Sequence, residues 1–238
     1  MCLIVFAWKL IPQCPLVLAA NRDEFFSRPA QSADWWSDQP EVFAGRDLEG
    51  GGTWLGVNRQ GRFAALTNIR NGYEPSREKR SRGELVSNFL SQDISAQAYL
   101  EQVHSNGEHY NGFNLILGDE QAMYWVSNGN ESDWQAIEPG IYGLSNGTLD
   151  SPWPKVVRAK AQFASLLCQG APDDAYFEML SDTTQAADSR LPDTGVSLEL
   201  ERMLSPICIE SEHYGTRVSS LVRVHAGGKA ELRERVIR

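Results

Sequence analysis

The feature that most constrains the fold is the pair of apolar runs that follows Cys2. Residues 3–8 and 16–20 are apolar without interruption, and a segment with two prolines, residues 11–15, separates them. Short apolar runs on either side of a turn predict a β-hairpin. Because neither run alternates with polar residues, we expect these strands to be covered on both faces.

The rest of the chain alternates between strand-like and helix-like patterns. Strands are predicted at residues 53–58, 63–67, 113–117, 122–126, 140–144, 216–224 and 229–236. Helices are predicted after the capping-box spacing of Ser81 and Glu84, at residues 95–103 and 156–168, after Pro172, and at residues 196–204. This order predicts an α+β fold in which two stacked antiparallel sheets lie between helical layers, with residues 3–8 as a central strand. With no linker or repeat between two units, residues 1–238 are expected to form a single domain.

Composition excludes several classes of function. The chain is 42% hydrophobic and 22% charged, as in ordinary folded proteins, and its net charge is -9. This acidic balance argues against nucleic acid or an anionic membrane as the main partner, because both require a basic face. No segment is long enough to cross a bilayer, and the first apolar run is broken by Lys9 without a preceding basic stretch. The four cysteines and four histidines are dispersed. We therefore expect a cytoplasmic protein with free thiols and with no metal or other cofactor.

Cys2 is the first candidate for chemistry. Removal of Met1 would make Cys2 the N-terminal residue and place a thiol and an α-amine on one residue. The amine has an ordinary pKa of about 7.7–8.0 and the thiol about 8.5, so the amine can accept the thiol proton. The alternative is that Cys2 is a small apolar residue at the start of a strand.

A charged cluster, Asn21, Arg22, Asp23 and Glu24, directly follows the second apolar run. In a hairpin this segment returns beside Cys2, where a guanidinium favours thiolate and a carboxylate can hold the amine or the arginine. We expect Arg22 or Asp23 within side-chain reach of Cys2. The alternative is a solvated turn that carries an ion pair.

Two further features have an ordinary and a functional interpretation. Residues 50–53, Gly-Gly-Gly-Thr, lack the lysine and the following helix of a phosphate loop, and predict a turn that permits close backbone approach. Asn68 and Asn146 each follow a strand. Their amides can stabilise an oxyanion or can cap turns. We expect a pocket beside Cys2 with apolar walls, partly of Trp or Phe, and with polar ends from Asn68 and Asn146.

Together these motifs resemble a known family. The similarity rests on Met1-Cys2-Leu3-Ile4, on the run Asn21-Arg22-Asp23-Glu24 with its flanks, on residues 51–56 and 66–68, and more loosely on residues 144–147 and 214–217. These look like the NRDE family, also called the transport-and-Golgi-organisation family. That family is similar to the cysteine N-terminal-nucleophile (Ntn) hydrolases, which include choloylglycine hydrolases, penicillin V acylases and isopenicillin-N acyltransferases.

The resemblance implies a four-layer αββα fold and cleavage or transfer at an amide. By this resemblance Cys2 is the nucleophile, Asn68 the oxyanion-hole asparagine, Asn146 the second active-site asparagine and Arg217 a late arginine. The hydrolases place their arginine and aspartate three residues apart, whereas Arg22 and Asp23 are adjacent here.

Two functions follow as alternatives. The first is a cysteine Ntn-type amidohydrolase or acyltransferase that acts on a small acyl-amide. The second is a non-catalytic binding or carrier protein for a lipid, acyl or haem-like ligand on the same scaffold, since one fold hosts many functions. The sequence specifies neither the substrate nor the oligomeric state.

Overall fold

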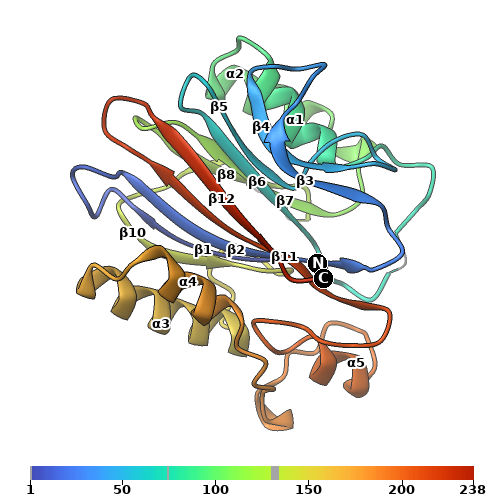
Figure 1. Ribbon diagram of the computed structural model, residues 1–238. Helices are drawn as coiled ribbons and strands as arrows, with labels where there is room; N and C mark the ends of the chain where they lie inside the picture. The colour runs from blue at the N-terminus through green and yellow to red at the C-terminus, as the bar shows by residue number, and fades with distance from the viewer. Residues whose placement is uncertain (1, 74, 130–133) are drawn as a thin grey trace.

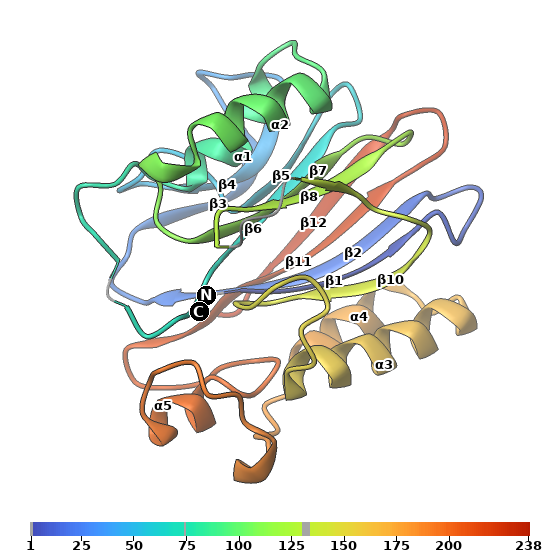
Figure 2. The same ribbon diagram turned by 180° about the vertical axis from the view of Figure 1, so that it is seen from behind.

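Two antiparallel sheets lie face to face at the centre of the molecule (Figures 1 and 2). The computed structural model describes residues 2–73, 75–129 and 134–238. In order across the first sheet, the strands are β10 (Gly140–Leu144), β1 (Cys2–Trp8), β2 (Leu16–Phe25), β11 (Tyr214–Val224) and β12 (Ala230–Val236). In order across the second, they are β3 (Ala30–Trp35), β4 (Val42–Asp47), β5 (Leu55–Asn58), β6 (Phe63–Asn68), β7 (Phe113–Gly118), β8 (Met123–Ser127) and β9 (Gln135–Ala136).

Helices cover the outer face of each sheet. Figure 2 shows α1 and α2 against the second sheet and α3 and α4 against the first, with α5 beyond the sheet end near the termini. Their bounds are α1 (Gly83–Ser91), α2 (Ala96–Ser105), α3 (Pro154–Gln169), α4 (Asp173–Leu180) and α5 (Leu198–Met203), with short 3-10 helices at Gly107–His109 and Asp188–Arg190. The molecule thus has the predicted four layers. Within the ranges described, none of these helices is both long and apolar enough to pass through a bilayer.

The alternation of β1 explains why its sequence is apolar throughout. Ile4 and Phe6 pack into the core between the two sheets. Leu3 and Val5 pack on the other side, into the core beneath α3 and α4. Because side chains of a strand point alternately to its two faces, a strand buried on both faces needs apolar residues at every position. The prediction of a central, doubly covered first strand is confirmed, with β10 and β2 as its neighbours.

Two local predictions were wrong, and two strands were not predicted. The cluster of residues 21–24 does not follow a strand; it lies inside β2, which continues to Phe25. The edge strand β3 was not predicted because it is polar and mostly exposed and so lacks an apolar run. Its neighbour β4 was also not predicted, because its apolar run is only three residues long, Val42 to Ala44. Finally, the capping box does not form: α1 begins after Arg82 without a side-chain cap, and the Glu84 carboxylate instead accepts a hydrogen bond from Tyr110.

Candidate active site at Cys2

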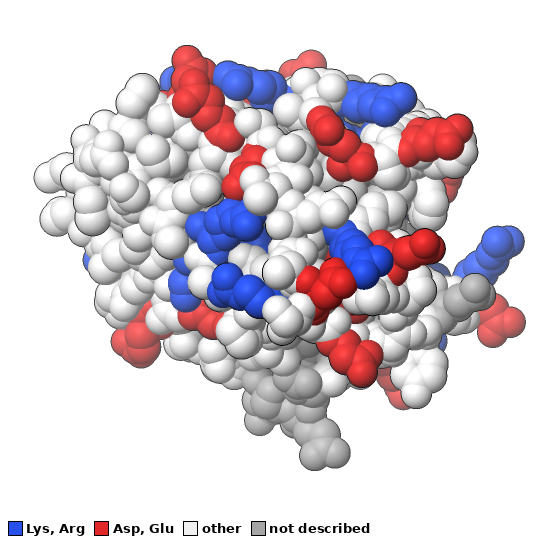
Figure 3. All heavy atoms as spheres, turned by 90° about the horizontal axis from the view of Figure 1, so that it is seen from below, with Lys and Arg blue, Asp and Glu red and all other residues white. Residues whose placement is uncertain are grey.

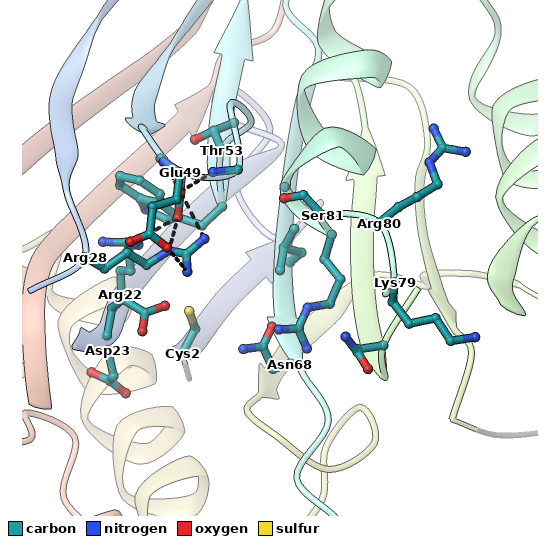
Figure 4. A pocket seen from close by; sticks show the side chains of 18 of the residues that line it. Cys2, Arg22, Asp23, Arg28, Glu49, Thr53, Asn68, Lys79, Arg80 and Ser81 are labelled. Atoms are coloured by element: carbon teal, nitrogen blue, oxygen red, sulfur yellow. Dashed lines mark hydrogen bonds and ion pairs between the residues drawn. The ribbon is translucent and has the colours of Figure 1, made fainter. Parts of the chain in front are cut away.

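Cys2 and Arg22 stand directly opposite each other in the antiparallel pair of β1 and β2. Side chains of directly opposite residues project from the same face of a sheet. For this pair it is the face of Ile4 and Ala20, which belong to the core between the sheets. Both side chains therefore face the second sheet. Figure 4 shows the Cys2 thiol pointing into a cavity, with Arg22 on one side and Asn68 on the other.

The cavity has a volume of about 660 Å³ and lies between the sheet ends and the segment of residues 76–83. Ten charged residues contribute to its lining, six of them cationic and four anionic, and Asp23 contributes through its main chain. The cations are Arg22, Arg28, Arg77, Lys79, Arg80 and Arg82, and the anions are Asp23, Glu24, Asp47 and Glu49. Trp54 and Leu66 are the large apolar contributors. The expectation of apolar walls was therefore wrong, because the charged residues of two loops and of β2 close this end of the core.

This concentration of cations differs from the distribution of charge on the face seen in Figure 3. On the face seen in Figure 3, lysine and arginine lie among aspartate and glutamate, and neither sign covers the face. A net charge of -9 thus coexists with a cationic majority among the charged residues of the lining, of which Lys79 and Arg80 point away from Cys2 (Figure 4).

Asp47, at the end of β4, holds the two arginines of the cavity wall. Its carboxylate lies 3.3 Å from Nη2 of Arg22 and 2.6 Å from Nε of Arg28. Burial pushes the pKa of Asp47 upward, but the hydrogen bond from Arg28 and the charges of both arginines outweigh it, so the pKa lies below its ordinary value. Asp47 could not be recognised from the sequence, since a single aspartate outside any predicted strand or motif is indistinguishable from a surface residue.

Arg22 itself is almost fully buried, with 5% of its surface exposed. Its guanidinium stacks over the ring of Trp54 at 4.2 Å from the centroid. Within the described part of the chain, Nη1 has no hydrogen-bond partner. A buried guanidinium nitrogen without a partner is costly, so this position beside Cys2 is suited to an acceptor group of a ligand.

Asp23 faces the opposite side of the sheet because it follows Arg22 on the same strand. Its Oδ1 accepts a hydrogen bond of 2.7 Å from the Thr216 hydroxyl. Its backbone N–H interacts with the Cys2 thiol, so Asp23 lies close to Cys2 through its main chain. Burial raises the pKa of the Asp23 carboxyl, and the charge of Lys155 opposes this shift.

Asn21 serves the architecture. Its Nδ2 donates to the carbonyls of Leu180 and Ile207 at 2.8 and 2.9 Å, and its Oδ1 accepts from Ser219 at 2.7 Å. These bonds tie β2 to the end of α4 and to the segment that precedes β11. The four-residue cluster is therefore divided between two faces of the sheet and is not a solvated turn.

A hydrogen bond joins the two asparagines, and Ser145, next to Asn146, bonds to the backbone of Cys2. Asn68, the last residue of β6, lines the cavity, and its side chain points toward Cys2 (Figure 4). Asn146 is fully buried and does not line the cavity; its Nδ2 donates to the Asn68 carbonyl at 2.8 Å. Next to it, Ser145 Oγ donates to the Cys2 carbonyl at 3.0 Å. Asn146 and Ser145 thus fix Asn68 and Cys2 relative to each other, and Asn146 does not form the second polar end of the pocket.

Arg217 lies outside the cavity lining. It sits at the irregularity in the pairing of β11 with β2, between Thr216 and Val218. Its guanidinium donates to the backbone carbonyls of Phe25 and Arg28. The structure therefore places Arg217 where it holds the turn that carries Arg28, and does not bring it to Cys2.

Lys155 is the second residue that sequence analysis missed. It lies in the first turn of α3, is 3% exposed, and its Nζ has no hydrogen-bond partner among the described residues. Burial lowers the pKa of Lys155 to about 8, with Asp23 the strongest opposing charge. One lysine at the start of a helix is normally a surface residue, so the sequence offers no signal for its burial.

The thiol of Cys2 is not activated by its surroundings alone. Burial raises its pKa above the ordinary value, and the charge of Arg22 is too weak to reverse this. No histidine is among the described residues that line the cavity. The described residues also include no group of three or more potential metal ligands. The described lining therefore offers neither a histidine nor a metal site to accept the proton of the Cys2 thiol.

Solved structures of similar fold include an acid amidase and a bile acid hydrolase. The N-acylethanolamine-hydrolyzing acid amidase ortholog of Caenorhabditis elegans superposes with a TM-score of 0.52 over 92% of this chain and 91% of that one, at 10% identity. A variant of the conjugated bile acid hydrolase from Clostridium perfringens gives 0.57 over 98% of this chain and 89% of that one, also at 10% identity. At this identity the likeness shows the fold, and the predicted Ntn-hydrolase-like sandwich is confirmed.

Sequence relatives cover nearly the whole chain. The Transport and Golgi organization protein 2 homolog of Bos taurus is 38% identical, with 99% of this chain and 92% of the relative aligned. The homolog of Homo sapiens is 37% identical with the same coverage, and the Drosophila melanogaster protein is 28% identical over 96% of this chain and 89% of the relative. The family model described as Transport and Golgi organisation 2 matches residues 1–238. The chain therefore belongs to the Transport and Golgi organisation 2 family.

Proposed function

We propose that this protein, once Met1 is removed, is a cysteine amidohydrolase or acyltransferase that acts on a small acyl-amide. The observation that carries the proposal is the position of Cys2: it begins a central strand, stands opposite Arg22 and faces Asn68 across a cavity large enough for a small-molecule ligand. A nucleophile, a buried cation and an amide donor are thereby gathered at one end of a rigid sheet.

The proposed reaction proceeds through a thioester. The free α-amine of Cys2 takes the proton of its thiol, and the sulfur attacks the amide carbonyl carbon. The side-chain amide of Asn68 donates a hydrogen bond to the resulting oxyanion. The C–N bond then breaks, the ammonium of Cys2 returns the proton to the departing amine, and the acyl group stays on sulfur. Water completes hydrolysis, and a second amine in its place completes acyl transfer.

The charge of the cavity supports a substrate that carries a negative group. Arg22 and Arg28 share Asp47, and Arg80 pairs with Glu84. On the same segment as Arg80, the side chain of Arg77 makes no hydrogen bond or ion pair with any described residue, and Arg82 donates from Nη1 to the Gly112 carbonyl. These two cations remain available to a carboxylate, sulfonate or phosphate on the substrate.

The alternative is a binding protein on the same scaffold, and one experiment separates the two. Protein with a verified N-terminal Cys2 is incubated with acyl-amides that carry a carboxylate, such as N-acyl amino acids, and both products are measured. Turnover that is present after Met1 removal, absent before it and lost in Cys2→Ala supports the enzyme. Tight, saturable binding of the same compounds without turnover, unchanged in Cys2→Ala, would replace the enzyme with the carrier.

A further inference from the structure

Lys155 is a buried ammonium that has no role in the proposed reaction. Its Nζ is inaccessible and has no hydrogen-bond partner among the described residues. Lysine is almost never fully buried unless it is paired. A small void with space for about one water lies beside it, bounded by Arg70, Glu201 and Trp153. The position is thus polar and enclosed, and it lies on the side of the first sheet opposite the substrate cavity.

Four ionisable groups from different elements act on Lys155. They are Asp23 on β2, Cys2 on β1, Arg70 after β6 and Glu201 on α5. Arg70 and Glu201 neutralise each other, because their side chains form a buried ion pair of 2.8 Å. Asp23 therefore remains as the principal counter-charge for Lys155.

The register of β1 and β2 places the same carboxylate near the Cys2 main chain. Cys2 is opposite Arg22, so Asp23 lies one residue further along β2, on the side of the Cys2 backbone nitrogen. Its main chain already interacts with the Cys2 thiol. When Cys2 becomes the first residue, its α-amine and the Lys155 ammonium border the same carboxylate.

We propose that Lys155 is a positioning residue for the nucleophile: its buried ammonium shares the Asp23 carboxylate with the α-amine of the processed chain and so keeps that amine neutral. The inference rests on the proposed function, since it gives Lys155 a role in activating Cys2. A carboxylate alone would stabilise the protonated amine, which cannot accept the thiol proton. A second cation on the same carboxylate removes most of that stabilisation.

The test is the pH dependence of Cys2 alkylation by iodoacetamide, on protein whose N-terminal Cys2 is verified by intact mass. Lys155→Met should move the acidic limb of the profile to higher pH by about one unit, since the amine then has the carboxylate to itself. Asp23→Asn should move it to lower pH. Lys155→Arg, which keeps the charge, should lie near the parent. Lys160→Met, which removes a partly exposed lysine of the same helix, should leave the profile in place.

Opposite shifts that appear in the processed protein and are absent from protein that retains Met1 are the expected signature, since direct action of the two charges on the thiol would appear in both forms. Selective labelling of Cys2 with coincident profiles for Lys155→Met and the parent would overturn the inference and leave the proposed function standing. Labelling of Cys2 no faster than that of buried Cys14 in the processed parent would overturn both. If circular dichroism shows that Lys155→Met does not fold, Asp23→Asn decides: an unmoved or alkaline-shifted profile overturns the inference.

Discussion

Cys2 and Arg22 face the same cavity because they are directly opposed across two antiparallel strands, whereas Asp23, the next residue, turns to the helical side. A cluster that is continuous in sequence therefore supplies two different environments. The cavity side receives a cation beside the thiol, and the helical side receives a buried carboxylate beside Lys155. This division explains how adjacent arginine and aspartate residues can both lie near Cys2.

The state of the N-terminus should decide which cysteine reacts. In protein that retains Met1, burial raises the pKa of the Cys2 thiol, while Cys168 is exposed. At neutral pH iodoacetamide should therefore label Cys168 first and Cys2 slowly. After Met1 removal the order should reverse, because the α-amine accepts the thiol proton. Peptide mass mapping of timed samples measures both orders, and the same order in the two forms would argue against activation by the amine.

The basic wall of the cavity should set the preference for anionic substrates. Arg77→Glu replaces a cation that makes no ion pair with described residues, so it should raise the KM of a carboxylate-bearing amide about tenfold or more, with a smaller effect on a neutral amide. Lys9→Glu, an exposed change that leaves the cavity lining intact, is the matched control. Steady-state kinetics on the two amides provide the measurement. Equal effects of Arg77→Glu on both amides would show that the wall does not recognise charge.

A close backbone contact should make replacement of Gly52 destabilising. A Cβ at Gly52 would lie 2.3 Å from the backbone carbon of Gly83, where the Gly50–Gly52 turn meets the start of α1. Neither backbone can move away easily, so Gly52→Ala should destabilise the protein by about 1–3 kcal/mol. Gly107→Ala is the control, since its Cβ would meet only a side-chain carbon at 3.4 Å. Urea denaturation of both variants tests the difference, and equal midpoints would contradict it.

Much of the fold could be predicted because burial imposes a readable pattern. The apolar run of β1 indicates burial on both faces of the strand, and the glycines of the Gly50–Gly52 turn indicate a close approach of two backbone segments. The site was only partly predictable. Arg22 and Asn68 directly follow or lie close behind apolar runs in the sequence, but Asp47 and Lys155 reach the site through the second sheet and α3, and such long-range packing leaves no local pattern. The prediction of apolar walls was wrong for the same reason. In the sequence, the charged segment of residues 76–82 looks like a solvated loop, and only the fold shows that it lies beside Cys2.

The ion pair of Arg70 and Glu201 should be a strong structural link between α5 and the segment after β6. Both side chains are buried, at 8% and 4% exposure, and Glu201 also accepts a hydrogen bond from Thr194. Glu201→Gln leaves the Arg70 charge buried without its carboxylate and should cost about 3–5 kcal/mol. Asp188→Asn breaks the neighbouring exposed pair with Arg202 and should change stability little. Thermal unfolding compares the two, and similar losses would contradict the distinction.

Lys155 should also leave a mark on the pH dependence of stability. Burial lowers its pKa in the folded protein to about 8, against about 10.4 in an unfolded chain. Between these values the unfolded chain binds more protons than the folded protein, so the free energy of unfolding should rise with pH. Over this window the difference between the parent and Lys155→Met should move in favour of the parent by up to about 3 kcal/mol. Below pH 8 the lysine is protonated in both states and the difference should be constant. Because raised tyrosine pKa values affect both proteins equally, urea denaturation of the pair at pH 7, 8, 9 and 10 isolates the contribution of the lysine.

A difference in the free energy of unfolding that stays constant across this range would mean that Lys155 keeps an ordinary proton affinity despite its burial. It would also weaken the case for its influence on Asp23.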